Sequence, residues 1–381
     1  MKTPLCEQLG IEFPIFAFSH CRDVVASVSK MGGMGVLGAV ALSAEELEQE
    51  LQCLDRETEG RPYGVDTVIP ASYVGKSSGD LSKQDLAAMV PEVHQTFIAG
   101  LLARYGVPEL PETVKTTESL LGWTVSSGLA HVDVALAHER CKLIANALGP
   151  PPKSMIDKAH AQGVMVAALC GTVPQALKQK EAGVDIIVAS GYEAGGHTGE
   201  IGSLVLTPQV VDAVAPIPVL AAGGIGCGRQ MAAAMVLGAQ GVWTGSIWLT
   251  TFDSECLPPL VDKLLAATST DTVRSRCISG KPARQLVTDY TRAWDEMPQG
   301  TLKMPLQWMA TAETTQRIHR HAARGGGAEL LGTPVGQVVG QMNARASVPT
   351  VIGELVDEYL EAVEWVARLS DLLPAAETTL G

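Results

Sequence analysis

The chain has 381 residues, of which 46% are hydrophobic and only 4% aromatic, and its formal net charge is −13. Such an acidic chain is not expected to bind nucleic acid or an anionic membrane surface, and no uninterrupted apolar run is long enough to span a bilayer. The eight cysteines include no CxxC pair, and the N-terminal MKTPLCEQLG lacks the apolar core of a signal peptide. We therefore expect a cytoplasmic protein with reduced thiols and without a metal site.

Short apolar runs that end in turn residues predict eight strands. They are Ile15–Phe18, Gly35–Leu37, Gly64–Ile69, Leu143–Leu148, Val164–Leu169, Asp185–Ala189, Pro218–Ala222 and Gly241–Thr244. Helical patterns separate most of them, at Val24–Met31, Ala44–Glu57, Lys153–Ala161, Val173–Glu181, Pro208–Ala213 and Gln230–Leu237. A βα unit repeated eight times predicts an α/β protein with a TIM (β/α)8 barrel, and an open doubly wound sheet is the alternative.

The segment Ser72–Glu139 lies between the third and fourth predicted strands and is far too long for an ordinary βα loop. Its composition is helical over Gln84–Tyr105 and Glu118–His138. Since loops after barrel strands emerge at the catalytic face, we expect a helical cap over the barrel mouth, with a sideways dimer contact as the alternative. A cap would bring apolar side chains toward the site, namely Phe97, Leu101, Leu121 and Trp123.

The chain after about Glu255 shows no βα repeat, but it carries helical runs at Leu257–Ala267 and Val351–Leu369. We therefore predict a barrel domain over residues 1–254, with residues 72–139 inserted in it. A mostly helical C-terminal region over 255–373 would follow, and then a tail over 374–381.

Two glycine clusters predict a phosphate site. Gly223 and Gly224 follow the seventh strand, and Gly245 and Ser246 follow the eighth. The loops after these two strands of a TIM barrel frequently bind phosphate through backbone N–H groups, and the Ser246 hydroxyl can add a donor. The dinucleotide fingerprint GxGxxG fails because its third glycine would fall on Arg229. Tight turns without a ligand are the structural alternative.

A histidine follows two glycines just after the sixth strand, in Gly195-Gly196-His197. The ordinary pKa of histidine, near 6.5, suits general base catalysis at neutral pH, and Glu193 can either orient the ring or cap the loop. His20, after the first strand, is the second candidate. We expect Lys281 and Arg284 to lie in a surface turn, with an anion contact as the alternative. We expect four other histidines to lie on solvated helix faces, namely His131, His138, His319 and His321.

These segments resemble the nitronate monooxygenases, FMN-dependent TIM-barrel enzymes related to the flavin enoyl-ACP reductases. The resemblance is carried by TPLCEQLGIEFPI, MGGMGVLGA, RPYGV, ALGPPP, AGVDIIVASGYEAGGHTG, PVLAAGGIGCGRQMAAAMVLGAQGV, SGKPAR and GTPVGQVVG. It implies that His197 is the catalytic histidine. It also implies an FMN phosphate site at Gly223, Gly224, Gly245 and Ser246, and a loop beside the flavin at Gly191, Gly195 and Gly196.

The chain departs from the family where the flavin ring or the substrate would lie. Ala17-Phe18-Ser19 replaces the usual Ala-Pro-Met, Asp66 stands where the family has asparagine, and Ser190 stands where glutamine is common. Ala17, Asp66 and Ser190 are therefore candidate cofactor contacts, and the resemblance fixes the cofactor better than the substrate.

The resemblance implies oxidation of a nitroalkane or nitronate. His197 would take the α-proton or hold the anionic nitronate, and the flavin would pass an electron to O2, leaving a carbonyl compound and nitrite. One alternative is a quinone or enoyl-thioester reductase that uses NAD(P)H, or an acyl-thioester dehydrogenase; another is a non-catalytic flavin- or ligand-binding barrel. The expected partners are a small-molecule substrate and O2 or NAD(P)H, and the chain can form a homo-oligomer.

Overall fold

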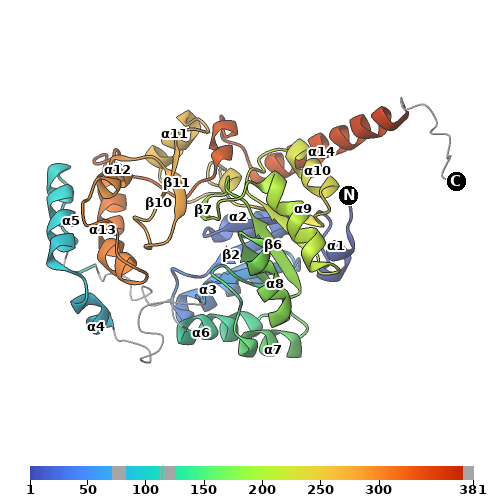
Figure 1. Cartoon of the computed structure of the whole chain (residues 1–381), viewed down its shortest axis with the longest axis horizontal. Helices are drawn as coiled ribbons and strands as arrows, with labels where there is room; N and C mark the ends of the chain where they lie inside the picture. The colour runs from blue at the N-terminus through green and yellow to red at the C-terminus, as the bar shows by residue number, and fades with distance from the viewer. Residues whose placement is uncertain (71–82, 112, 115–124, 372–381) are drawn as a thin grey trace.

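The computed structural model describes residues 1–70, 83–111, 113–114 and 125–371 (Figure 1). Eight parallel strands form a closed barrel in the order β1-β2-β3-β4-β5-β6-β8-β9. They are β1 Ile15–Ser19, β2 Met34–Gly38, β3 Tyr63–Thr67, β4 Cys141–Asn146, β5 Met165–Cys170, β6 Ile186–Ser190, β8 Val219–Ala222 and β9 Gly241–Thr244. The predicted TIM barrel is confirmed, and each strand lies within a few residues of its predicted range.

The barrel helices also follow the sequence pattern. They are α2 Arg22–Lys30, α3 Ala44–Glu57, α6 Val125–Leu136, α7 Lys153–Ala161, α8 Val173–Ala182, α9 Ser203–Val214 and α10 Gly228–Val236. Local signals fix some boundaries, as in α3, where Ser43 and Glu46 form a capping box. A further helix, α1 Pro4–Leu9, packs its apolar side chains against the interior of the barrel.

Strand alternation divides the core into two layers. The inner layer contains Phe16, Met34, Leu143, Ile186, Leu220 and Trp243, and the outer layer against the helices contains Leu37, Val65, Ile144, Val166 and Ile187. At the carboxyl ends of the strands, the inward positions are small at Gly38, Ser190 and Ala222. The rings of Phe18 and His20 fill the space at Gly38, whereas Ser190 and Ala222 keep their ends of the strands small.

The inserted segment divides into parts that pack differently. The helices α4 Lys83–Ala88 and α5 Glu92–Arg104 join the C-terminal region, because Leu101 and Leu102 share a core with Trp294. By contrast, α6 packs on α3 and on the barrel as an ordinary crossover helix.

The expectation that Phe97 and Leu101 turn toward the catalytic site is wrong. The ring centroid of Phe97 lies 4.9 Å from that of Trp294, and Leu101 is buried in the same core. Burial against the C-terminal helices satisfies these apolar side chains, so they are not available to line a pocket. Leu121 and Trp123 lie outside the described residues.

The C-terminal region contains α11 Pro258–Ala266, β10 Thr272–Ser275, β11 Ala283–Leu286, α12 Asp289–Asp295, α13 Leu306–Ala322 and α14 Val348–Asp371. The strands β10 and β11 were not predicted. They form an antiparallel sheet with β7, the two-residue strand Gly196–His197 from the barrel loop. At the other end of the region, α14 returns to pack on α10 and α2 (Figure 1).

Three further observations concern the chain as a whole. Residues 374–381 lie outside the described residues. All eight cysteines are free thiols. No helix in the described part of the chain has the length and apolar character needed to cross a membrane.

Candidate active site

The four predicted phosphate residues lie at the carboxyl ends of the adjacent strands β8 and β9, and we refer to them as the glycine cradle. Gly223 and Gly224 have φ angles of +90° and +73°, which glycine adopts readily and other residues rarely do. Gly245 and Ser246 begin η3, the 3-10 helix Ser246–Trp248. Among the described residues, none accepts a hydrogen bond from the backbone N–H groups of these four residues. Because these four residues are partly exposed, their N–H groups are available to an anionic ligand such as a phosphate.

Glycines are sterically required where the loop after β6 crosses its neighbours. A Cβ atom on Gly191 would overlap the Ser203 hydroxyl, and one on Gly195 would lie 2.8 Å from the Gly336 backbone nitrogen. The Glu193 carboxylate accepts hydrogen bonds from the Ser203 backbone N–H and hydroxyl, both at 2.9 Å. Of the two predicted roles of Glu193, orienting the His197 ring and capping the loop, the hydrogen bonds to Ser203 support the capping role, at the start of α9.

The C-terminal region holds the His197 ring by both nitrogens. Nδ1 lies 3.2 Å from the Pro282 carbonyl oxygen, and Nε2 lies 3.3 Å from the Ser279 hydroxyl. A carbonyl oxygen can only accept, so Nδ1 carries the ring proton, and the Ser279 hydroxyl donates to the lone pair of Nε2. The strand pairing of His197 with Ala283 fixes the backbone of this loop at the same place.

His197 is neutral at physiological pH. The residue is partly exposed, and both of its ring nitrogens contact the C-terminal region. Desolvation of the charged form is the main reason why the pKa of His197 falls to about 4, and the positive charge of Lys281 lowers the pKa further. The hydrogen bond to Pro282 opposes this shift. The ring is therefore a hydrogen-bond acceptor and a weak base at neutral pH.

Arg284 is buried, so its predicted place in a surface turn is wrong. Its side chain lies on β11, where Nε donates to the Tyr192 carbonyl oxygen at 3.0 Å and Nη1 donates to the Thr272 hydroxyl at 3.0 Å. Its guanidinium carbon also lies 4.4 Å from the centre of the Tyr192 ring. Because β11 pairs with Gly196, Arg284 ties the loop that carries His197 to the C-terminal sheet.

His20 occupies a different part of the mouth. Its Nδ1 lies 3.0 Å from the Gly38 carbonyl oxygen, and its ring packs edge-on against Phe18 at 5.1 Å between centroids. No hydrogen bond between His20 and His197 is present in the part of the chain that the structure describes. The two candidate histidines are therefore held by separate partners.

The remaining candidate cofactor contacts differ in orientation. Ser190 lies at the end of β6 on the inward-facing side, and Asp66 lies likewise at the end of β3. The methyl group of Ala17 instead packs in the outer layer with Val24 and Val242, so the side chain does not line the mouth. Alternation along β1 explains this difference, because Phe18 takes the inward position.

Asp66 is a buried carboxyl group whose Oδ1 has no hydrogen-bond partner among the described residues. Burial raises the pKa of Asp66 to about 8, so the group is protonated near neutral pH and can donate as well as accept. A donor at this position resembles the asparagine that Asp66 replaces more closely than a carboxylate would.

Asp66 should make the stability of the protein fall as pH rises. Between an unfolded-state pKa near 4 and a folded-state pKa of about 8, the folded protein keeps a proton that the unfolded chain releases. Each pH unit in this window should therefore lower the free energy of unfolding by up to about 1.4 kcal/mol relative to Asp66→Asn. Urea unfolding of both proteins at pH 5 and pH 8 measures this, and equal pH dependence would contradict the assignment.

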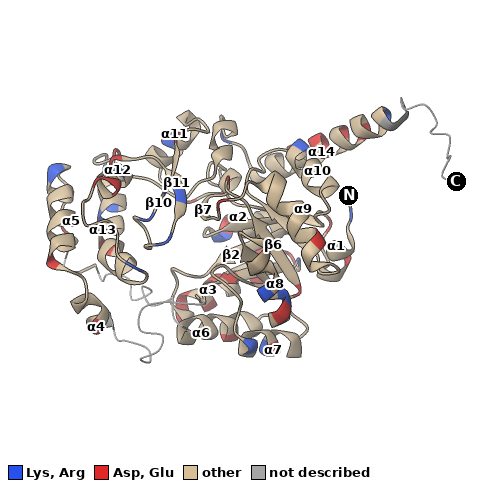
Figure 2. Ribbon diagram, in the orientation of Figure 1, with Lys and Arg blue, Asp and Glu red and all other residues tan. Residues whose placement is uncertain are grey.

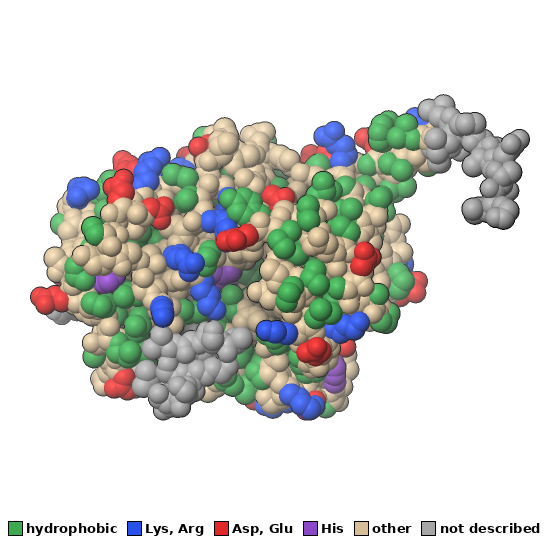
Figure 3. All heavy atoms as spheres, viewed as in Figure 1, with side chains coloured by type: hydrophobic (Ala, Val, Ile, Leu, Met, Phe, Trp, Pro, Cys, Tyr) green, Lys and Arg blue, Asp and Glu red, His purple; other side chains and the backbone are tan. Residues whose placement is uncertain are grey.

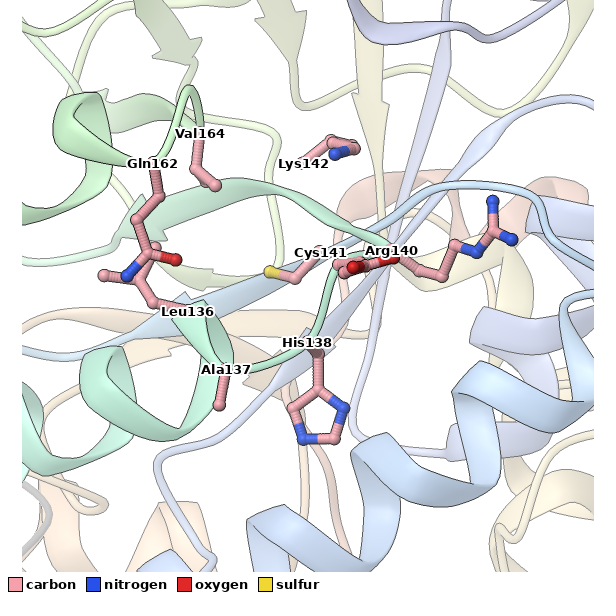
Figure 4. Close-up of a pocket in the computed structure, with 9 residues that line it drawn as sticks. Leu136, Ala137, His138, Arg140, Cys141, Lys142, Gln162 and Val164 are labelled. Atoms are coloured by element: carbon pink, nitrogen blue, oxygen red, sulfur yellow. The ribbon is translucent and has the colours of Figure 1, made fainter.

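A separate cavity lies at the opposite end of the barrel and is polar. Its volume is ≈ 550 Å³, and it is lined by residues 136–142 with Gln162 and Val164, around the start of β4 (Figure 4). In TIM barrels the chemistry lies at the carboxyl ends of the strands, so this cavity is not the candidate active site. No group of His, Cys, Asp or Glu side chains in the described ranges is arranged to hold a metal ion.

The prediction of solvated helix faces is wrong for two of the other histidines. His131 is buried and its Nε2 bonds the Leu42 carbonyl oxygen at 2.9 Å, while His138 is buried between Asp55 and Glu48. His319 and His321 are partly buried on α13. These four side chains lie on helices or in the loop before β4, and no hydrogen bond of theirs involves the cradle.

Ser279 and Pro282, which contact the His197 ring, were not among the predicted site residues, whereas Lys281 lies in a turn as predicted and is partly exposed. The signal that could have found them is the SGKPAR segment, which lies far from the barrel motifs and joins them only through the pairing of β7 with β11. Figure 3 shows Lys and Arg side chains around a hollow at the centre of this face, with a histidine visible inside it.

Comparisons with known proteins find relatives that match nearly the whole chain. A family model described as "Nitronate monooxygenase" matches residues 2–358. The chain is 48% identical to a candidate monooxygenase, Rv1533, of Mycobacterium tuberculosis, over 95% of this chain and 98% of that protein. It is 31% identical to a probable nitronate monooxygenase of Staphylococcus aureus strain Newman, over 87% of this chain and 90% of that protein.

Two solved structures are similar over nearly the whole chain. A nitroalkane oxidase from Streptomyces ansochromogenes has a TM-score of 0.77 at 27% identity, covering 93% of this chain and 98% of its own. FabK from Thermotoga maritima has a TM-score of 0.72 at 25% identity, covering 97% and 99%.

Proposed function

This chain belongs to the nitronate monooxygenase family and is a flavin-dependent oxidoreductase, and from that premise we propose that it binds FMN and oxidises nitronates with O2 to a carbonyl compound and nitrite. The observation that carries the proposal is the position of His197 on the loop after β6, at the face that also holds the glycine cradle. The small-molecule substrate would lie in the hollow beside this histidine.

The cradle fits a single terminal phosphate. Four backbone N–H groups without acceptors among the described residues lie at the ends of β8 and β9. The Ser246 hydroxyl adds a donor, while its oxygen accepts from the Gly336 N–H at 2.8 Å. The residues that would hold FMN are therefore Gly223, Gly224, Gly245 and Ser246, with Gly191, Gly195 and Gly196 alongside. The protonated Asp66 and Ser190 can supply hydrogen bonds at the inward ends of β3 and β6. When bound, the flavin would supply the capacity to take electrons from the substrate and return them to O2.

His197 is the residue proposed to handle the substrate proton. Nε2 of His197 can accept an α-proton once the Ser279 hydroxyl turns away from its lone pair, while Pro282 holds the ring through Nδ1. A pKa of about 4 is far below working pH, so His197 is a weak base. This low basicity favours the preformed nitronate over the neutral nitroalkane as substrate, because the nitronate has already lost its α-proton.

Steady-state assays separate this proposal from its alternatives. The protein should consume O2 and release nitrite with a nitronate, at a rate well above that with the corresponding nitroalkane. Faster turnover with NAD(P)H plus a quinone or an enoyl thioester would instead favour a reductase on the same barrel. Flavin binding without turnover of any of these substrates would favour a non-catalytic flavin-binding protein.

A further inference from the structure

The turn that holds His197 also carries a lysine. Residues 279–282 lie just before β11, which pairs with β7, and they contact both nitrogens of the His197 ring through Ser279 and Pro282. Lys281 lies between these two residues, and its backbone N–H donates to the Ser279 hydroxyl oxygen at 3.3 Å. Lys281 is therefore part of the turn whose residues contact the His197 ring.

The Lys281 ammonium group makes no ion pair and no hydrogen bond within the described part of the chain. No carboxylate there lies within ion-pair distance of Nζ, and no hydrogen bond from Nζ is present. The side chain is partly buried, and burial lowers the pKa of Lys281. The positive charge of Lys281 also lowers the pKa of His197.

The other charged groups near this loop already have partners. Arg274 donates to the Thr198 carbonyl oxygen and lies 3.7 Å from Glu200, Arg284 bonds Tyr192 and Thr272, and Glu193 accepts from Ser203. Figure 2 shows basic residues on and beside β10 and β11. Among them, Lys281 is the one whose charge acts on His197.

A neutral histidine with a lone pair on Nε2 does not attract an anion. A nitronate carries its negative charge on two oxygens, and the net charge of −13 on the chain would repel it. An anionic substrate at His197 therefore needs a positive charge nearby. Resting on the function proposed above, we propose that Lys281 is the specificity residue that binds the negatively charged oxygens of the nitronate beside His197.

This role separates two substrates that differ by one proton. Lys281 should stabilise the bound nitronate through a charge-assisted hydrogen bond and should contribute little to binding of the neutral nitroalkane. It should likewise bind a small planar oxyanion such as nitrate, which has oxygens of the same kind but cannot react.

The test compares Lys281→Met with Lys281→Arg, which keeps the charge, and with Lys178→Met. Lys178 is exposed on α8, so its replacement alters net charge equally without touching the site. Loss of one charge-assisted hydrogen bond should raise the KM for nitronate by about 10- to 100-fold in Lys281→Met. The KM for the nitroalkane should stay within about threefold, and Lys281→Arg should recover most of the loss.

Nitrate binding to the flavin-loaded protein, followed by the change in flavin absorbance, gives a readout independent of turnover. Nitrate should bind wild type, Lys178→Met and Lys281→Arg, and about 10- to 100-fold more weakly to Lys281→Met. Equal nitrate affinity and equal nitronate KM in wild type and Lys281→Met would overturn the inference. If wild type binds nitrate through Lys281 but does not turn over nitronates, the proposed function fails while the anion site stands. Lys281→Gln provides the same comparison if the methionine variant does not fold.

Discussion

Replacing His197 with asparagine is expected to reduce kcat for a neutral nitroalkane by about 10²- to 10⁴-fold while the protein keeps its flavin. Asparagine can replace some hydrogen bonds but cannot accept a proton near neutral pH. With a preformed nitronate the loss should be smaller, about tenfold or less, because no α-proton has to be removed. The ratio of the two losses, measured by steady-state kinetics on both substrates, isolates the proton-transfer role.

The pH dependence of the same reaction provides a second check. Because the pKa of His197 lies near 4, the neutral ring that accepts the proton is present throughout the range from about pH 5 to 8. The advantage of wild type over His197→Asn in nitroalkane turnover should therefore disappear only as pH falls through about 4, where the ring becomes protonated. If His197→Asn stays within a few-fold of wild type on both substrates, His197 is not the base and His20 becomes the candidate to examine.

The variant Gly224→Val should lose its flavin. The backbone of Gly224 has a φ of +73°, which a β-branched residue does not tolerate, and its N–H belongs to the cradle. A Cβ atom at this position would lie 3.6 Å from the Glu193 Cβ atom, which is ordinary contact, so the expected loss comes from the backbone conformation. We expect flavin affinity to fall by about 100-fold or more, since several charge-assisted hydrogen bonds are lost together. The flavin released from wild type by heat and identified by chromatography should be FMN.

Gly163→Val is the matched control. Gly163 has a φ of +68° and open space around its Cβ position, and it lies between α7 and β5 at the opposite end of the barrel. The two variants should lose comparable stability from backbone strain, but only Gly224→Val should lose the flavin. Equal flavin content in both variants would show that the cradle does not bind the cofactor, and recovery of FAD from wild type would exclude a monophosphate site.

The barrel could be predicted because its signals are local. Each strand is a short apolar run that ends in glycine or a polar residue, and helices such as α3 carry their own capping residues. The positions of Gly223 and Gly224 were also accessible to sequence reasoning, since these glycines directly follow a predicted strand. In both cases the informative residues are neighbours in the sequence.

The hydrogen bonds that hold the His197 ring could not be predicted because their partners lie far away in the sequence. The sequence separation is 82 residues between His197 and Ser279 and 85 residues between His197 and Pro282. The strands β10 and β11 have four residues each, too few for a clear alternation pattern. The buried state of Arg284 likewise depends on Tyr192, which the sequence does not connect to it.

The division of the inserted segment has a similar cause. The sequence pattern indicated helices in residues 72–139 but not the surfaces on which they pack. Pro91 separates α4 from α5 because proline cannot continue the helix of the preceding residues. Tertiary contacts such as that of Phe97 with Trp294 show that α5 belongs with the C-terminal helices, whereas α6 belongs with the barrel.

Anaerobic reduction of the bound flavin tests the central claim most directly, because it identifies the electron donor without depending on the oxidant. The purified yellow protein is mixed without O2 with either a nitronate or NADH, and bleaching of the flavin absorbance near 450 nm is followed over time (on the order of seconds for a typical enzyme turnover). The account predicts rapid bleaching by the nitronate and slow or no bleaching by NADH. Rapid bleaching by NADH with no response to the nitronate would contradict it.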